Sequence, residues 1–282
     1  MQYYYRFPGF RLKTLTFSYD DGVRQDRRLV EILHKNGLSG TFNLNSSTLG
    51  EEDDLAAPHG RLSVSSAREV YHTPGIEVAV HTYTHPHLEW QPSSTVMHEV
   101  VEDRRVLEEI FGRPVTGMAY PYGTHAPHVV EVLRQAGIKY SRTTVSTERF
   151  DMPSDWLRLP ATCHHNNPNL MALGDKFLAL TDNEQRRDWA RLSMFYVWGH
   201  SYEFDDNDNW QIIEEFAAKM AGHDDIWYAT NGEIYDYCKA IERLEISVDG
   251  KSCYNPSAID VYFYANGKQY IARAGETLTV ES

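Results

Sequence analysis

The stretch Leu12-Lys-Thr-Leu-Thr-Phe-Ser-Tyr-Asp20-Asp21-Gly22 joins an apolar segment to an acidic turn. Its first part, Leu12–Phe17, is typical of a buried strand, and a helix is expected to follow from Asp26, a candidate N-cap, to Gly37. The same order of apolar strand and amphipathic helix recurs over most of the chain. This alternation favours a parallel α/β fold, either a barrel or a doubly wound sheet.

The remaining elements follow from the same patterns. Further strands are predicted at residues 41–44, 76–80, 115–119, 138–141, 195–198 and 226–229. Further helices are predicted at residues 95–111, 127–136 and 210–221, and a last one near Glu233 behind a cap at Thr230. Residues 46–74 are expected to form a long irregular insertion. Neither a GxGxxG nor a GxxxxGK[ST] pattern is present, which weakens the dinucleotide and P-loop interpretations.

The chain changes character near Leu244. Glu245–Gly250 alternates between polar and apolar residues, and two apolar runs flank Asn266-Gly267, a strong hairpin signal. We therefore predict a barrel domain over residues 1–243 and a small β-hairpin appendage over residues 244–282. An appendage of this size must pack on the main domain or on a partner, and an open strand edge would allow a homo-oligomer.

Composition narrows the function. The 282 residues include 27 Lys and Arg against 40 Asp and Glu, a formal net charge of −13, which disfavours nucleic acid and anionic membranes as partners. No two of the three cysteines have CxxC spacing, so neither a disulfide framework nor a zinc finger is expected. The first residues lack the basic and apolar regions of a signal peptide. We expect a cytoplasmic protein, with a trimmed leader as the alternative.

Polar side chains follow several of the predicted strands. They meet at the carboxyl ends of the strands, which carry the active site in parallel α/β barrels. The residues concerned are Asp20, Asp21, His81, His85, Tyr122 and His200. Two adjacent carboxylates before a glycine would serve as one metal ligand and one base, although a solvated Asp-Gly turn is the alternative.

Histidines add to this pattern. His81 and His85 are four residues apart, so on a helical turn both could bind one ion, and Asp21 would complete a two-histidine, one-carboxylate set with open positions. Zinc or another divalent ion such as Co²⁺ or Mn²⁺ suits this set. His200 could shuttle protons near neutral pH, or be a structural histidine. Of His164 and His165, one is expected at the pocket mouth, where it contacts substrate or adds a ligand; a polar loop is the alternative.

Taken in order, these segments resemble the polysaccharide deacetylase family (carbohydrate esterase family four, the nodulation-type deacetylase homology domain) over about residues 12–243. The family's first motif, Thr-Phe-Asp-Asp-Gly, is similar to residues 16–22 with two residues inserted. Its second motif, His-Ser/Thr-x-x-His-Pro, matches residues 81–86. The third motif, Arg-x-Pro-Tyr-Gly, matches residues 119–123 except that Ala119 stands where the arginine is expected. The histidine of the fifth motif matches His200.

The resemblance implies a distorted (β/α) barrel, often of seven strands. It also implies a hydrolase that removes acetyl groups from an N- or O-acetylated saccharide with one divalent metal ion, most often zinc, with cobalt, manganese and nickel as alternatives. By the same resemblance Asp20 is the general base that acts on a metal-bound water, Asp21, His81 and His85 are the ligands, and His200 is the general acid. The metal and the Tyr122 backbone N–H would hold the oxyanion.

Two departures from the family pattern concern the site. We predict that Arg142, just after the next strand, replaces the missing arginine beside the base, with Arg158 as second choice. The fourth motif, Asp-x-x-Asp-Trp, is only echoed by residues 151–156. That echo would make Asp155 the partner of His200 and place Trp156 in the sugar site, with core packing as the alternative for Trp156.

Two other functions stay open. The missing arginine is compatible with a hydrolase of a small linear or cyclic amide on the same fold, with or without a metal. A catalytically inactive carbohydrate-binding protein would not need all of the acidic and histidine residues of the site, which argues against it.

Overall fold

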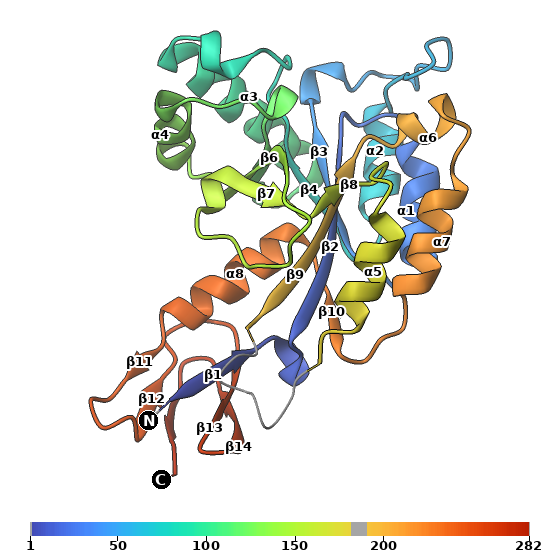
Figure 1. Ribbon diagram of the computed structural model, residues 1–282. Coiled ribbons are helices and arrows are strands. Elements are labelled where there is room, and N and C mark those ends of the chain that lie inside the picture. Colours follow the sequence, from blue (N-terminus) through green and yellow to red (C-terminus); the bar gives the residue numbers. More distant parts are fainter. Residues whose placement is uncertain (1, 182–190, 282) are drawn as a thin grey trace.

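The computed structural model describes residues 2–181 and 191–281. Its centre is a parallel sheet of nine strands in the order β7-β6-β5-β4-β3-β2-β9-β8, with β10 paired to β2 (Figure 1). These strands are β2 (Lys13–Asp20), β3 (Gly40–Leu44), β4 (Ile76–Val80), β5 (Gly117–Ala119), β6 (Tyr140–Ser146), β7 (Leu159–Ala161), β8 (Cys163–His164), β9 (Ser193–Gly199) and β10 (Ile226–Tyr228).

The two outermost strands of this order, β7 and β8, are joined by Thr162 alone. The sheet must therefore curl until its edges meet, which gives the predicted distorted (β/α) barrel. Sequence patterns predict only seven of the nine strands. The two others, β7 and β8, are three and two residues long, too short to show a hydropathy period.

Helices surround the barrel (Figure 1). They are α1 (Asp26–Lys35), α2 (Val64–Tyr71), α3 (Ser93–Phe111), α4 (Pro127–Gln135), α5 (Leu170–Leu178), α6 (Tyr202–Asp206), α7 (Gln211–Met220) and α8 (Asn231–Glu242). Because β2 has neighbours on both edges and helices outside it, all eight of its residues are buried. No helix of the described ranges is long and apolar enough to cross a membrane.

Two local predictions differ from the structure. The segment 46–74 contains α2, whose cap Ser63 accepts a hydrogen bond from the Ser66 N–H. The N-cap of α1 is Gln25 rather than Asp26. Asp26 is instead buried, where it accepts hydrogen bonds from Tyr71 and Ser201, and its burial raises the pKa of its carboxyl to about 7.

Helix α8 closes the amino-terminal end of the barrel. Thr230 and Glu233 form a reciprocal capping box at its start. The next residue, Asn231, accepts a hydrogen bond from Thr16 Oγ1 of β2 at 2.9 Å and donates to the Tyr196 hydroxyl of β9. The amino-terminal end is thus filled by protein, and the carboxyl ends of the strands are the end left for chemistry.

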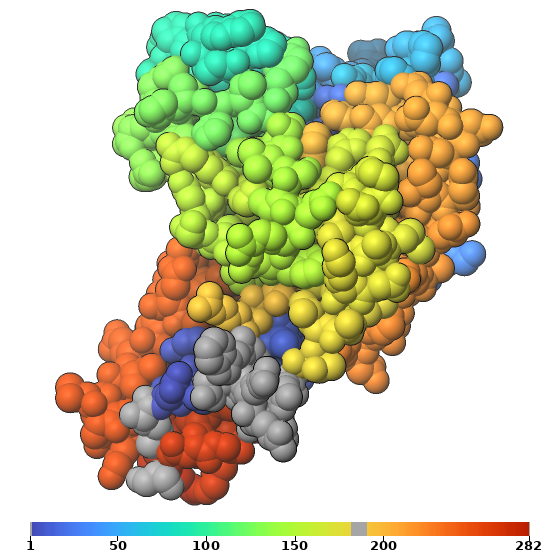
Figure 2. Space-filling model, in the orientation of Figure 1, coloured from blue at the N-terminus to red at the C-terminus, as the bar shows by residue number. Residues whose placement is uncertain are grey.

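Two small antiparallel sheets form the appendage, which projects from the barrel in Figures 1 and 2. One contains β11 (Glu245–Ile246), β12 (Ser252–Tyr254) and β15 (Thr277–Thr279); the other contains β1 (Tyr3–Arg6), β13 (Val261–Ala265) and β14 (Lys268–Ala272). Asn266 and Gly267, both at positive φ, make the predicted hairpin turn. The appendage also takes in β1 from the other end of the sequence, a pairing that the hydropathy pattern gives no sign of.

Candidate functional site

The Asp20 carboxylate lies at the end of β2, is almost fully buried and has several polar neighbours. Its Oδ2 accepts a hydrogen bond from the Arg142 guanidinium, and its Oδ1 accepts one from Asn43 Nδ2 at 2.8 Å. Burial alone would raise the pKa of the carboxyl. The charges of Arg142, His81 and His200 outweigh burial and hold this pKa below its usual value. Asp20 is therefore ionised at neutral pH and held in one orientation.

Strand register explains how Arg142 comes to this position. In the pairing of β5 with β6, Arg142 lies directly beside Ala119, the residue that stands where the family pattern has arginine. A guanidinium from the neighbouring strand thus enters the barrel at the same level. The Arg142 side chain is fully buried and lies over the Trp198 ring, 4.5 Å from its centroid. The second choice, Arg158, pairs with Asp155 instead.

Three potential metal ligands meet beside Asp20. The Nε2 atoms of His81 and His85 are 3.1 Å apart, and both lie within 3.9 Å of Asp21 Oδ1. The two imidazoles meet through a loop rather than a helical turn, because Thr82 and His85 both have positive φ. Asp21, also at positive φ, is fixed by its N–H, which donates to the Asn43 carbonyl at 2.9 Å.

This donor set fits a divalent ion. His81 Nδ1 is 2.9 Å from the Ala119 carbonyl oxygen, which places the proton on Nδ1 and leaves the Nε2 lone pair facing Asp21. Burial and the neighbouring His81 lower the pKa of His85 to about 4, so His85 also offers a lone pair at neutral pH. The 3.1 Å between the two nitrogens is close to the spacing of about 3.3 Å between neighbouring ligands of a tetrahedral zinc ion.

His200, directly after β9, also contacts Asp20. Its Nε2 is 3.9 Å from Asp20 Oδ2, and its Nδ1 is 3.3 Å from Glu203 Oε1. Burial lowers the pKa of His200, but Glu203 and the aspartates raise it more, so the pKa lies above its usual value. Glu203, three residues further on in α6, is therefore the carboxylate that orients His200.

Glu203 also contacts both histidines of the Cys163-His164-His165 segment. His164 Nε2 and His165 Nε2 lie 3.1 Å and 3.0 Å from Glu203 Oε2. These contacts, with that of His200, overcome the effect of burial and hold the pKa of Glu203 well below its usual range. His165 is fully buried between the Tyr19 and Phe204 rings, so of these two histidines His164 is the one that is partly exposed.

The sequence patterns described above do not single out Glu203, which lies in the acidic run of residues 201–209. The available signal is its spacing: a carboxylate three residues after a histidine faces it on a single helical turn. His200 lies just before α6, which begins at Tyr202, and the Glu203 N–H donates to the His200 carbonyl at 3.2 Å, so the two residues share one turn.

The structure does not bring Asp155 and Trp156 to this site. Asp155 caps a short 3₁₀ helix at residues 156–158 and pairs with Arg158. Trp156 packs against Tyr235 of α8, at the closed end of the barrel. Trp156 therefore has the packing role that was the alternative to a place in the sugar site.

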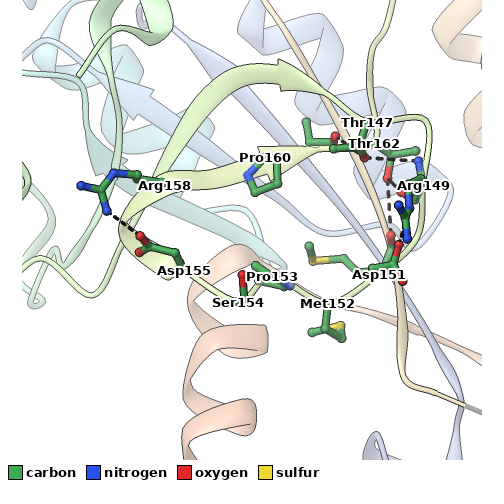
Figure 3. A pocket seen from close by; sticks show the side chains of 12 residues that line it. Thr147, Arg149, Asp151, Met152, Pro153, Ser154, Asp155, Arg158, Pro160 and Thr162 are labelled. Atoms are coloured by element: carbon green, nitrogen blue, oxygen red, sulfur yellow. Dashed lines mark hydrogen bonds and ion pairs between the residues drawn. The ribbon is translucent and has the colours of Figure 1, made fainter. Parts of the chain in front are cut away.

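A cavity of about 340 Å³ lies beside Asp155 (Figure 3). It is lined by Asp155 and Arg158 on one side and by Arg149 and Asp151 on the other. Met194, which also lines it, pairs with Thr14, six residues before Asp20 on β2. At the usual rise per strand residue, the position of Thr14 on β2 is roughly 20 Å along the strand from Asp20. The cavity is thus separate from the candidate active site.

Tyr122 lies at the outer rim of the site. Its backbone has a φ of 59°, and its ring meets the His85 ring edge-on at 4.7 Å between centroids. The structure thus brings together Asp20, Asp21, His81, His85, Tyr122, Arg142, His164, His165 and His200, with Glu203 in addition.

Comparison with known proteins bears on these residues. The family model described as polysaccharide deacetylase matches residues 9–141. A Mycobacterium smegmatis protein assigned to the polysaccharide deacetylases has a similar structure, with a TM-score of 0.60, 18% identity, and coverage of 84% of this chain and 93% of that one. No curated protein matches the chain.

Two further structures are similar. A mutant with restored enzymatic activity of a family-four pseudoenzyme from Bacillus anthracis has a TM-score of 0.50 and 17% identity, over 82% of this chain and 70% of that one. A Streptococcus pyogenes deacetylase in complex with acetate has a TM-score of 0.44 and 19% identity, over 51% of this chain and 61% of that one. The chain thus spans less than two thirds of the streptococcal protein.

The family match includes the Asp20-Asp21 turn and the His81–Pro86 segment, and it coincides with the first strands of a barrel like those of the solved relatives. By this match and this fold, the chain is similar to the polysaccharide deacetylase family.

Proposed function

We propose that the protein is a divalent-metal-dependent hydrolase that removes acetyl groups from an N- or O-acetylated saccharide. One observation carries this proposal: Asp20 is adjacent in the chain to Asp21 of the three-ligand set and also contacts His200, with contacts of 3.9 Å or less within the ligand set and from Asp20 to His200. This arrangement would provide a base (Asp20), a site for a metal ion and an acid (His200) close together. The match of residues 9–141 to the polysaccharide deacetylase family model supports the same chemistry.

Asp21, His81 and His85 would hold the metal, which when bound lowers the pKa of water and polarises the acetyl carbonyl. Asp20 takes the proton of the attacking water. Its low pKa keeps it ionised, and its bonds to Arg142 and Asn43 keep it aimed at the reacting centre. The Tyr122 backbone N–H would donate to the developing oxyanion.

His200 completes the reaction as the acid. Its Nδ1 faces Glu203, so the proton on Nε2 is directed toward the site. His200 gives this proton to the leaving amine or alcohol as the acyl bond breaks, and acetate is released. The raised pKa of His200 keeps the imidazolium populated near neutral pH.

Acetate release tests the proposal. Metal-loaded protein is incubated with chitooligosaccharides, which carry N-acetyl groups, and with acetylated xylan, which carries O-acetyl groups. Release of acetate from either supports the proposed function. If metal is bound and neither substrate releases acetate, the proposal fails, and linear and cyclic amides are then assayed as substrates. Sugar binding without any turnover would identify an inactive carbohydrate-binding protein.

The Arg142→Ala variant should lose about 10²-fold in kcat/KM at acidic pH. Without the guanidinium, burial dominates and the pKa of Asp20 rises, so the acidic limb of the pH–rate profile moves to higher pH. Arg142→Lys keeps a positive charge and should recover part of the loss. Arg158→Ala is the matched control. A value of kcat/KM for Arg142→Ala within a few-fold of the wild type rules out this role.

The Glu203→Gln variant should lower kcat by about 10-fold to 100-fold. The amide keeps the shape of Glu203 but removes the charge that raises the pKa of His200, so the alkaline limb of the profile should move to lower pH. Asp206→Asn, an exposed carboxylate of the same helix, is the control. An unshifted alkaline limb in Glu203→Gln would mean that Glu203 does not act on His200.

A further inference from the structure

A column of three rings stands beside the candidate metal site. The His87 ring stacks on the Tyr122 ring at 3.8 Å between centroids and 8° between planes. On its other face His87 stacks on Trp90 at 4.1 Å and 26°. We call Tyr122, His87 and Trp90 the aromatic column. The mechanism above uses only the Tyr122 backbone.

The column exposes a large apolar surface. The Trp90 side chain is 72% exposed and Tyr122 is 53% exposed, and the two are joined through His87. Single exposed apolar residues are ordinary, but adjacent stacked rings at the edge of an active site mark a binding surface. Because His87 covers only one face of the indole, the outer face of Trp90 is open.

Polar contacts hold the column in place. Glu89 Oε1 is 3.2 Å from His87 Nδ1, and Glu89 Oε2 accepts a hydrogen bond from Thr124 Oγ1 at 2.6 Å. These bonds join the loop after β4 to the loop after β5. Tyr122 keeps a positive φ that a bulky residue adopts only when its surroundings impose it. The rings are therefore pre-organised, which reduces the entropy lost when a ligand binds.

The column is continuous with the reaction centre. Its inner ring, Tyr122, contacts His85. The outer ring, Trp90, is two stacking contacts further from the ligand set, since His87 stands between it and Tyr122. A group bound on Trp90 would thus be attached to the acetylated sugar but lie beyond it. Open indole faces pack well against the apolar face of a pyranose ring, while the carboxylate of Glu89 and the imidazole of His87 can bond to hydroxyl groups.

We propose that the aromatic column is a subsite for the sugar next to the acetylated one, with Trp90 as its stacking platform. This inference rests on the proposed function. It means that the substrate is an oligosaccharide or polysaccharide, and that an acetylated monosaccharide is a poor substrate. The formal charge of −13 favours a neutral glycan over an anionic one in this position.

Two readouts test the subsite. The first is the binding of chitotetraose, measured by calorimetry on the metal-free chain, where no turnover occurs. Trp90→Ala should weaken this binding about tenfold, while Trp90→Phe, which keeps a ring, should retain most of it. The second is the ratio of kcat/KM for chitotetraose to that for N-acetylglucosamine, which should fall about tenfold in Trp90→Ala, mainly through KM.

Leu55→Ala, at another exposed apolar side chain (73%), is the matched control and should change neither readout. Equal binding of chitotetraose by the wild type and Trp90→Ala overturns the subsite, as does an unchanged substrate ratio. Loss of binding in Trp90→Ala supports the subsite even if the wild type releases no acetate. The failure of the proposed function is thus distinguishable from the failure of the subsite.

Discussion

Replacing Asp20 by asparagine should lower kcat for acetate release by about 10³-fold, within the range that a positioned general base contributes. The amide has nearly the same shape, but it cannot accept the proton of the attacking water. It also leaves the buried Arg142 guanidinium without its charged partner, so the ionic bond between β2 and β6 is lost. KM should change much less than kcat, because Asp20 acts on the water rather than on the sugar.

The control for this variant is Asp155→Asn. Asp155 is the carboxylate that the fourth-motif echo would place in the site, but it pairs with Arg158 next to the cavity in Figure 3. Asparagine at this position should leave kcat within about twofold of the wild type, as surface substitutions away from a site usually do. Thermal melting checks that both variants are folded. An Asp20→Asn enzyme with wild-type kcat would remove Asp20 from the role of base.

The His81→Ala variant should lose both the metal and the activity. Two ligands, Asp21 and His85, do not hold an ion in competition with water, and His81 is also the ligand whose tautomer is fixed by the Ala119 carbonyl. Metal affinity should fall by at least about 10²-fold. Elemental analysis of purified protein should find about one divalent ion per chain in the wild type, and close to none in the variant.

Because His81 is almost fully buried, a folding defect must be separated from loss of the ion. His81→Gln fills more of the space and serves as the second variant, with circular dichroism as the check. His72→Ala, at the histidine that forms the C-cap of α2 away from the site, should keep the full metal content. A wild-type protein that takes up no zinc or cobalt would end the metal-dependent mechanism and direct the search to metal-free amide hydrolysis.

Sequence patterns predict the fold and the site together where a buried strand ends in a polar residue of the site. The apolar run before Asp20 predicts β2, and the carboxyl-end rule then predicts that Asp20, His81 and His200 meet although they are far apart in the chain. The position of Arg142 is also accessible in this way, since a residue just after one strand can replace one at the end of its neighbour. The register of β5 and β6 supplies the reason.

Other features depend on tertiary contacts that no local pattern encodes. The echo of the fourth motif predicts Asp155 as the partner of His200, whereas Glu203, on the one-turn helix α6, takes that place. Asp26 has the residue type of an N-cap, but burial beside Tyr71 and Ser201 determines its place. The short strands β7 and β8 exist because the barrel closes there, not because their few residues favour extended structure.

The pairing of β1 with β13 has a consequence for biosynthesis. Tyr3–Arg6 leaves the ribosome before any strand of the barrel, yet its partner Val261–Ala265 is made only after α8 is complete. Throughout that interval β1 has an unsatisfied edge, which other nascent chains or chaperones can bind. The barrel can thus assemble during translation, whereas the β1-β13-β14 sheet must wait for a contact of very long sequence separation, and long-range contacts of this kind form slowly.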